Sequence, residues 1–318
     1  MSISSTMPSL SIIVPVYNSA ETLANLIARF ESALAGYNIE AILVNDGSHD
    51  LSWKIIQQLT EKYKWVRGIN LMRNFGQHNA LLCGIRAARH EIIVTIDDDL
   101  QNPPEEIPRL LSYLSEEIDV VYGTPQKEQH GFWRDMASQI TKLVLQHAMG
   151  AETARKVSAF RVFRAYLREA FVNYHGPFVS IDVLLTWGTT KFTSVTVTHH
   201  QRQAGLSNYN LRKLITHAIN MLTGFSTLPL QIASLIGFIF TLFGIAILIF
   251  VILRYFIQGN VAPGFPFLAS IIAIFSGAQL LALGIMGEYL ARMYFRMMDR
   301  PSYAVRACLS ENAKENED

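Results

Sequence analysis

The stretch EIIVTIDDD, residues 91–99, joins an apolar run to three consecutive aspartates, Asp97, Asp98 and Asp99. The apolar run has the length and composition of a buried strand. Like charges packed this closely repel one another, and a buried unpaired carboxylate is costly. A hard divalent cation such as Mg²⁺ or Mn²⁺ offsets that cost, because it binds carboxylate oxygens and shares its remaining positions with substrate phosphates. A solvated acidic turn or a helix N-cap has the same sequence, so the aspartates alone leave both interpretations open.

The first 125 residues alternate short apolar runs with amphipathic stretches. Farther along the chain, residues 191–199 alternate like an edge strand. Over the first 125 residues, we expect strands over residues 10–16, 39–44, 66–71, 91–96 and 119–123, and helices over residues 20–34, 51–63 and 79–88. This alternation predicts an α/β fold with a doubly wound, mainly parallel sheet and right-handed crossovers. Ligands of such sheets bind outside the carboxyl ends of the strands.

Polar side chains follow four of the predicted strands at the point where each strand ends. They are Tyr17 and Asn18, Asp46, Arg73 and Asn74, and the aspartates Asp97 to Asp99. Because the carboxyl ends of parallel strands meet at one edge of the sheet, we expect these groups to converge on a single binding site.

Apolar residues are concentrated near the C-terminus, although the mean hydropathy of the whole chain is only +0.21. Residues 230–253 and 255–287 contain no charged side chain. Since about 20 apolar residues cross a bilayer, we expect two transmembrane helices joined by the turn-rich residues 258–264. A buried hairpin in a soluble protein is the alternative. Basic residues flank the hairpin on its outer sides and are Arg202, Arg212, Lys213, Arg292, Arg296 and Arg300, with Arg254 near the tip as an exception.

By the positive-inside rule, both ends of the hairpin are expected in the cytoplasm. The polar N-terminus, residues 1–8, has no signal-peptide core, which also favours a cytoplasmic globular part. Residues 210–223 have apolar positions at helical spacing and predict an interfacial helix on the membrane, or else an ordinary surface helix. We therefore expect a catalytic domain over residues 1–208, an interfacial helix over 209–227, a membrane hairpin over 228–298 and a cytoplasmic tail over 299–318.

Two bulk properties exclude other classes of protein. The 27 basic and 26 acidic residues nearly balance, so the charge does not indicate nucleic-acid binding. Cys83 and Cys308 have no nearby cysteine partner in the sequence, so neither a disulfide framework nor a zinc site is indicated. Small residues in the hairpin, Gly237, Thr241, Ala278 and Ala282, allow close helix packing and agree with a homo-oligomer.

Four motifs carry a resemblance to a known family: IIVPVYN at residues 12–18, VNDGS at 44–48, RNFG at 73–76 and DDDLQNPP at 97–104. In order and spacing they resemble the motifs of the inverting GT-A glycosyltransferases. Within that group the chain is similar to polyprenyl-phosphate glycosyltransferases of the dolichol-phosphate mannose synthase type. The expected hairpin, followed by GEYLAR at 287–292 and RPSY at 300–303, resembles the bacterial undecaprenyl-phosphate glucosyltransferases most.

The resemblance implies a nucleotide-sugar donor, with UDP-glucose the best guess, a Mg²⁺ or Mn²⁺ cofactor, and undecaprenyl phosphate as the acceptor in a bacterial-type inner membrane. The lipid phosphate would attack the anomeric carbon in line. The resemblance assigns Pro15 and Tyr17 to the nucleoside of the donor, and Asp46 to its base or ribose. Asp97, Asp98 and Gln101 would lie beside the sugar and diphosphate. Arg202 and Ser207 would belong to a loop that closes over the diphosphate. Asp99, together with Asp97, would bind the metal. A simple turn or helix cap is the alternative for Asp46.

Residues 158–163, SAFRVF, align with a family stretch whose second position is commonly an aspartate at the reaction centre. This chain has Ala159 there, which can neither accept a proton nor orient an acceptor. An engineered variant, a relaxed position and a misalignment all remain open, and we expect reduced activity. Because the second pKa of a phosphate is about 6, the acceptor is already largely ionised, so the chemistry does not require that carboxylate. Arg161 would face the acceptor phosphate or the pyrophosphate, with a structural ion pair as the alternative.

Three competing functions remain at this point. Two of them are the same transfer to a lipid phosphate with another sugar, either mannose from a GDP donor or an amino-arabinose from a UDP donor. The third is a membrane channel or flippase component with a vestigial enzyme domain, which Ala159 keeps open.

Overall fold

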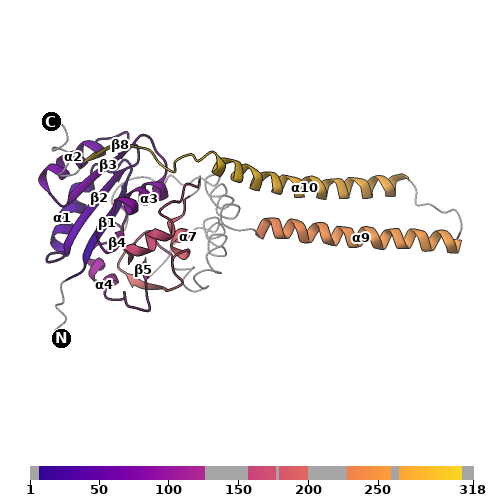
Figure 1. Cartoon of the computed structure of the whole chain (residues 1–318), viewed down its shortest axis with the longest axis horizontal. Coiled ribbons are helices and arrows are strands. Elements are labelled where there is room, and N and C mark those ends of the chain that lie inside the picture. The colour runs from indigo at the N-terminus through magenta and orange to yellow at the C-terminus, as the bar shows by residue number, and fades with distance from the viewer. Residues whose placement is uncertain (1–6, 126–156, 177–178, 200–227, 259–264, 310–318) are drawn as a thin grey trace.

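The computed structural model describes residues 7–125, 157–176, 179–199, 228–258 and 265–309. A globular domain carries a long helical hairpin that projects from one side (Figure 1). The expected helix over 209–227 and the expected loop with Arg202 and Ser207 lie outside the described residues.

The globular domain is built on an eight-stranded sheet with the order β7-β5-β6-β4-β1-β2-β3-β8. The strands are β1 (Ser9–Val16), β2 (Asn38–Asn45), β3 (Val66–Leu71), β4 (Ile92–Thr95), β5 (Val120–Pro125), β6 (Arg161–Arg164), β7 (Phe192–Val197) and β8 (Val305–Leu309). The α-helices are α1 (Leu23–Ala33), α2 (Ser52–Lys62), α3 (Gln77–Ala87), α4 (Ile107–Leu111), α7 (Ile181–Thr186), α9 (Leu228–Gln258) and α10 (Phe265–Met297). Short 3-10 turns are η1 (Pro104–Glu106) and η2 (Ala165–Ala170).

The predicted βα units form the parallel centre of this sheet. Strand β1 pairs in parallel with β2 and with β4, and β2 pairs in parallel with β3. The observed elements agree with the predicted ones to within a few residues at each end. The expected α/β fold with a mainly parallel centre is confirmed.

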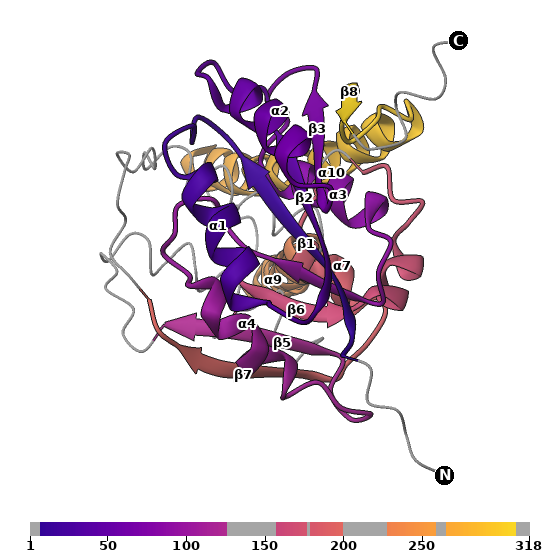
Figure 2. The same cartoon turned by 90° about the vertical axis from the view of Figure 1, so that its left-hand side faces the viewer.

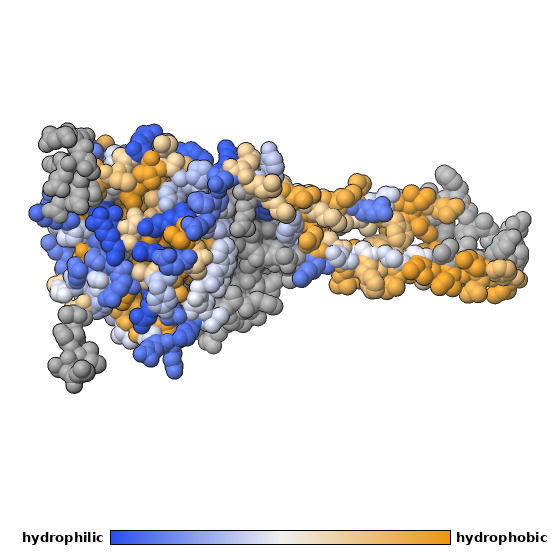
Figure 3. Space-filling view, in the orientation of Figure 1, coloured by the Kyte–Doolittle hydropathy of each residue, from blue (hydrophilic) through white to orange (hydrophobic). Residues whose placement is uncertain are grey.

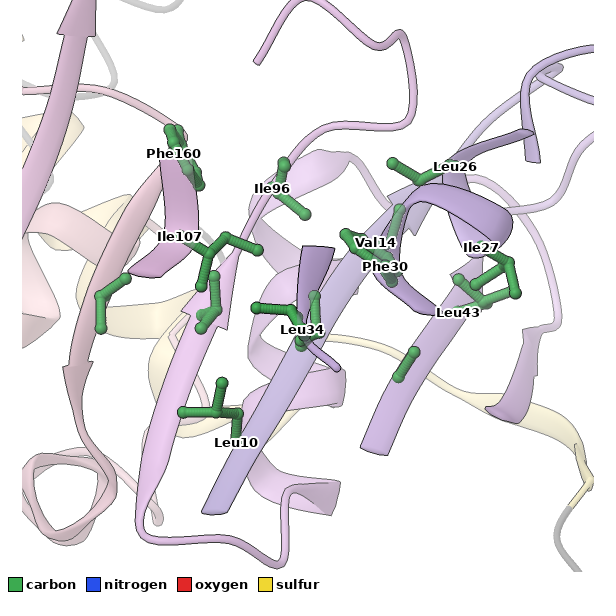
Figure 4. Close-up of a cluster of buried hydrophobic side chains, with 14 of the residues drawn as sticks. Leu10, Val14, Leu26, Ile27, Phe30, Leu34, Leu43, Ile96, Ile107 and Phe160 are labelled. Atoms are coloured by element: carbon green, nitrogen blue, oxygen red, sulfur yellow. The ribbon is translucent and has the colours of Figure 1, made fainter. Parts of the chain in front are cut away.

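Helices cover both faces of the sheet, because successive side chains of a strand point to opposite sides. Val14 of β1 lies in a cluster with side chains of α1, α2 and α4, whereas Ile13 lies in a second cluster with α3 and α7. Figure 4 shows Phe30 of α1 close to Val14 in the first cluster. On the other face, a Cβ added at Gly84 of α3 would collide with the side chain of Ile13, so glycine allows α3 to approach the sheet closely.

Two strands of the structure were not predicted from the sequence, and both run antiparallel to their neighbours. Strand β6 lies between β4 and β5 and is antiparallel to each, and β8 is antiparallel to β3 at the far edge. Figure 2 shows β7, β5 and β6 at one side of the sheet and β3 and β8 at the other. The sheet is therefore mixed at its flanks, and its last strand comes from the segment that follows the hairpin.

Helices α9 and α10 form the hairpin, and they contact each other through an edge-to-face pair, Phe240 and Phe275, with ring centroids 5.6 Å apart. The start of α9 and the end of α10 both lie next to the globular domain (Figure 1). By length and composition, Pro229–Ile247 and Ile274–Tyr294 can each cross a membrane. Only 6% and 0% of these two segments are buried, so the alternative of a buried soluble hairpin is wrong. Figure 3 shows hydrophobic residues along most of the visible hairpin surface.

Candidate functional site

A cavity of about 380 Å³ opens where the four parallel strands end. The residues that line it are Pro15, Val16 and Tyr17 after β1, Asp46 after β2, Asn74, Gly76 and Gln77 after β3, and Asp97, Asp98, Asp99 and Gln101 after β4. The volume lies within the usual range for a small-molecule site. The expected convergence of polar groups from four strand ends is confirmed, whereas the individual roles assigned to these residues remain predictions.

Asp46 organises one wall of this cavity. Its side chain is buried, and its two carboxylate oxygens accept hydrogen bonds from the backbone N–H groups of Phe75 (2.7 Å) and Gly76 (2.8 Å). Burial raises the pKa of Asp46, although these two hydrogen bonds act in the opposite direction. The carboxylate therefore holds the loop after β3 in place, a structural role that differs from the simple turn or helix cap given as its alternative.

The next residue, Gly47, makes that close approach of two loops possible. Its φ is +66°, and a Cβ added there would lie 2.5 Å from the carbonyl carbon of Arg73 and from the nitrogen of Asn74. A side chain at this position would separate the two loops, so glycine is required by both backbone conformation and space.

The three consecutive aspartates take different hydrogen-bond partners. Asp97 Oδ1 accepts a bond from the Gln77 side chain (2.6 Å), and Asp98 Oδ2 accepts one from the backbone N–H of Tyr17 (3.3 Å). Asp99 Oδ1 accepts a bond from the backbone N–H of Gln101 (3.1 Å). Desolvation raises the pKa of Asp98 to about 6, and the neighbouring Asp99 charge adds to this shift. Asp98 thus braces the end of β4 against the residue that follows β1, and all three aspartates line the cavity.

The donor set fits a hard divalent cation of the kind expected from the sequence. Mg²⁺ is usually bound through one or two carboxylates together with substrate phosphates, and Asp97 and Asp99 supply two carboxylates to one cavity. Among the described residues, no group of three or more histidine, cysteine, aspartate or glutamate side chains gathers around a possible metal position. Water molecules and phosphate oxygens of a substrate would therefore complete the coordination.

The structure places Arg161 in the core and not at the cavity. Its side chain is 1% exposed and forms an ion pair with Asp182, and its Nε donates a hydrogen bond to Thr95 Oγ1 at 3.1 Å. The Tyr122 hydroxyl also donates to Asp182, at 3.0 Å. The expectation that Arg161 faces a phosphate is therefore wrong. The structure instead contains the ion pair that was given as its alternative.

Ala159 lies just before β6, next to the strand that carries the aspartates. Its carbonyl oxygen accepts a hydrogen bond from Thr95 Oγ1 at 2.6 Å. Strand β6 pairs Arg161 with Thr95, so continuing this antiparallel register by two residues brings Ala159 opposite Asp97. An aspartate at position 159 would accordingly stand close to the aspartate cluster, although Ala159 itself does not line the cavity among the residues described.

Gln77 is the residue of the site that sequence reasoning missed. It is the first residue of α3, it follows the RNFG motif directly, and its side chain binds Asp97. The signal available was position alone, since a residue that begins a helix after a strand-end motif in this fold faces the ligand crevice.

Comparisons with known proteins identify the family of the chain. Residues 11–174 match the model of glycosyl transferase family 2. The chain is 35% identical over 321 residues to the undecaprenyl-phosphate 4-deoxy-4-formamido-L-arabinose transferase of Yersinia enterocolitica, covering 99% of this chain and 98% of that protein. The enzyme of the same name from Pectobacterium atrosepticum is 35% identical over 305 residues, with 94% and 93% covered. These names contain formamido-arabinose where we expected glucose.

Among solved structures, glucosyl-3-phosphoglycerate synthase from Mycobacterium tuberculosis, in complex with Mn²⁺, UDP-glucose and glycerol 3-phosphate, superposes with a TM-score of 0.53. It is 18% identical and covers 68% of this chain and 78% of its own, so it supports the GT-A fold alone. Taken with the family match and the full-length relatives, the chain belongs to glycosyl transferase family 2 and is a glycosyltransferase with a GT-A domain and a C-terminal apolar hairpin.

Proposed function

We propose that this enzyme transfers 4-deoxy-4-formamido-L-arabinose, or a closely related 4-amino sugar, from a UDP donor to undecaprenyl phosphate. The observation that carries the proposal is the 35% identity over 99% of the chain, hairpin included, to a transferase of that name. This reaction belongs to the UDP–amino-arabinose alternative kept open above. Glucose from UDP-glucose ranks second, because the solved neighbour that binds UDP-glucose resembles this chain in fold alone.

In the proposed reaction, one oxygen of the lipid phosphate attacks the anomeric carbon of the sugar. The bond from that carbon to the diphosphate breaks on the opposite face, which inverts the configuration and releases UDP. A lipid phosphate with a second pKa of about 6 is largely ionised at neutral pH, so no general base is needed at position 159. Absence of a carboxylate there is compatible with turnover.

The cavity residues bind and orient the donor. Pro15 and Tyr17 flank the nucleoside, and Asp46 keeps the loop with Asn74 against it. Asp97 and Asp99 would hold Mg²⁺ or Mn²⁺, a cation that neutralises the negative charge developing on the departing diphosphate. Asp98 and Gln101 close the same edge of the cavity.

The hairpin supplies the lipid surface for the acceptor. We place α9 and α10 in a bacterial inner membrane, with the globular domain and both ends of the hairpin on the cytoplasmic side. The support is the basic flanks of the hairpin and the exposure of its apolar side chains. Holding acceptor and donor side by side supplies much of the rate, because it converts an encounter in two phases into a reaction within one site. Arg202 and Ser207 remain proposed donor contacts, and a homo-oligomer remains a prediction.

The proposal is tested with membranes that contain the enzyme, undecaprenyl phosphate and one UDP-sugar at a time. With Mg²⁺ or Mn²⁺, we expect the lipid-linked formamido-arabinose product by mass spectrometry, and release of UDP. Product from UDP-glucose alone would show that the proposed sugar is wrong, and product from GDP-mannose alone would show that the proposed nucleotide is wrong as well.

Asp99→Asn should reduce transfer by about 100-fold, since the loss of a group that stabilises charge in the transition state costs this much in other enzymes. Glu117→Gln, at an exposed carboxylate that does not line the cavity, is the matched control.

Ala159→Asp tests the vestigial-enzyme alternative and the reduced activity expected from the sequence. If position 159 acts in catalysis, the aspartate should raise turnover. Wild-type turnover that Ala159→Asp does not improve would refute a catalytic role for this position. Absence of transfer by both proteins with every donor would favour the vestigial domain.

A further inference from the structure

After the hairpin, the chain returns to the globular domain through a segment that contacts the domain at two places, strand β3 and helix α3. This tail segment, residues 300–309, contains β8, which pairs with β3 at the edge of the sheet. Just before β8, the carbonyl oxygen of Ala304 accepts a hydrogen bond from the backbone N–H of Met72 at 2.9 Å. The end of the membrane hairpin is thus attached to the same sheet that carries the donor cavity.

Side chains of the tail segment add a second attachment, to α3. The Arg86 guanidinium lies 5.6 Å from the ring centroid of Tyr303 and donates a hydrogen bond to its hydroxyl at 3.5 Å. Arg86 also donates to the carbonyl oxygen of Tyr174 at 2.6 Å. Ser302, which is buried, donates to the carbonyl oxygen of Gly176 at 3.3 Å. Arg86 therefore joins three segments that are far apart in the sequence.

Tyr303 is packed into the domain and does not lie on its surface. It contacts the second core cluster, and its hydroxyl interacts with the Cys83 thiol as well as with Arg86. Cys83 is buried, whereas Cys308 in β8 is exposed. An arginine over an aromatic ring that is partly desolvated stabilises the pair more than the same contact does in water.

Helix α3 connects this attachment to the donor cavity. Its first residue, Gln77, lines the cavity and binds Asp97, and its last turn carries Arg86. The helix is about 16 Å long at 1.5 Å per residue, and the close approach at Gly84 packs it firmly against β1. A rigid element therefore has the donor site at one end and the tail segment at the other.

We propose that Arg86 and Tyr303 form a latch that fixes the direction of the membrane hairpin relative to α3, and so presents the lipid phosphate to the donor cavity. The inference rests on the proposed function for the identity of the acceptor. Arg86 is a positioning residue, because it acts on the hairpin through Tyr303 and contacts neither the cavity nor the aspartates.

The kinetic test compares Arg86→Met with Arg89→Met in full-length enzyme in membranes. Arg89 is an exposed arginine just beyond the same end of α3, which makes it the matched control. Arg86→Met should lower kcat/KM for undecaprenyl phosphate by between about tenfold and 100-fold, because misplacing a reacting group by about 1 Å has this effect. The KM for the UDP-sugar and the affinity for UDP should not change. Arg86→Lys, which keeps the cation over the ring, should restore part of the loss.

The second test does not depend on activity. In a Cys308→Ser background, the rate of maleimide labelling at Cys83 reports whether Tyr303 covers the thiol. We expect slow labelling in the parent and in Tyr303→Phe, and fast labelling in Tyr303→Ala. The exposed Tyr113→Ala is the control for loss of a tyrosine.

The outcomes separate the two proposals. A raised KM for the UDP-sugar or a weakened affinity for UDP in Arg86→Met, or no loss of kcat/KM for undecaprenyl phosphate, would overturn the latch, as would slow Cys83 labelling in Tyr303→Ala. If the wild type transfers no sugar to the lipid, the proposed function and the positioning role both fall. The labelling rates then still decide whether Tyr303 holds the tail segment against α3.

Discussion

The globular domain and the hairpin use the same kinds of apolar side chain in opposite ways. In the sheet, Ile13 and Val14 are fully buried, whereas Phe243 of α9 is 54% exposed and Leu280 of α10 is 69% exposed. An exposed apolar surface of this extent is unfavourable in water and favourable in a bilayer. The domain is therefore stabilised by its own core, whereas the hairpin has the exposed apolar surface expected of helices that can cross a bilayer.

Charged groups follow the same division. The domain buries ionised side chains in pairs such as Arg161 with Asp182 and Arg67 with Glu40. Within the described hairpin, the charged pair Glu288 and Arg292 lies near the end of α10, close to the globular domain. Substitutions that remove or add a charge should thus have different effects in the two regions.

The largest effect is expected from the buried pair in the domain. Arg161→Met should lower the free energy of unfolding by about 3–5 kcal/mol, because it leaves Asp182 buried without its cation. Replacing both partners, with Arg161→Met and Asp182→Leu, should recover part of the loss, because the buried Tyr122 hydroxyl would still lack its acceptor. Chemical unfolding of the full chain in detergent, followed by tryptophan fluorescence, measures both values. A single variant as stable as the wild type would show that the pair is dispensable.

A charge in the hairpin should have the next largest effect. Leu280→Arg places a cation on an apolar helix face, at a cost of about 2.5–3.5 kcal/mol at the bilayer centre. We expect less protein in the membrane fraction after carbonate extraction. Tyr113→Arg, at an exposed position in the globular domain, should leave membrane association unchanged. Equal membrane yields of the two variants would contradict a lipid environment for α10.

The smallest effect is expected from a carboxylate at the edge of the core, and it depends on pH. Burial alone would raise the pKa of Glu40, but hydrogen bonds from Ser11, Arg67 and the backbone N–H of Arg89 outweigh it and lower the pKa. The unfolded chain then binds the proton more tightly than the folded one. The stabilisation is present above the ordinary pKa of about 4.3 and is lost as the pH falls through the lower folded value.

Glu40→Gln should accordingly cost about 1.5–3 kcal/mol at pH 7, the range for hydrogen bonds to charged groups. The difference from the wild type should shrink in acid, as unfolding curves from pH 7 down to pH 3 can show. The exposed Glu117→Gln is the control. A difference that grows as the pH falls would mean that the pKa is raised and the sign is wrong.

Local patterns predicted the elements whose information is local. The run of residues 66–71 and the helix around Phe30 have the periodicities of a strand and a helix, and both occur as expected. Strand ends that carry Tyr17, Asp46 and Asp97 were predicted to converge because parallel strands share one carboxyl edge. The hairpin was predicted from the length of its two apolar segments and from their lack of charged residues.

Strands β6 and β8 escaped prediction because each is short and pairs with residues distant in the sequence. The contact of Arg306 with the carbonyl oxygen of Met72 spans 234 positions, for example. No local pattern states which edge of the sheet is free to accept such a strand.

The amino-acid sequence by itself determined an α/β domain with acidic groups at one sheet edge, followed by an apolar hairpin. The physical reason is that periodicity, composition and the order of elements along the chain can be read from short segments. The tertiary structure alone decided that Arg161 pairs with Asp182 and that Asp46 holds the loop after β3. It also decided that Gln77 reaches Asp97 and that Tyr303 reaches Arg86. The partner of a polar side chain is set by which backbones the packed core brings within about 3 Å, the range of a hydrogen bond, and that depends on the whole chain.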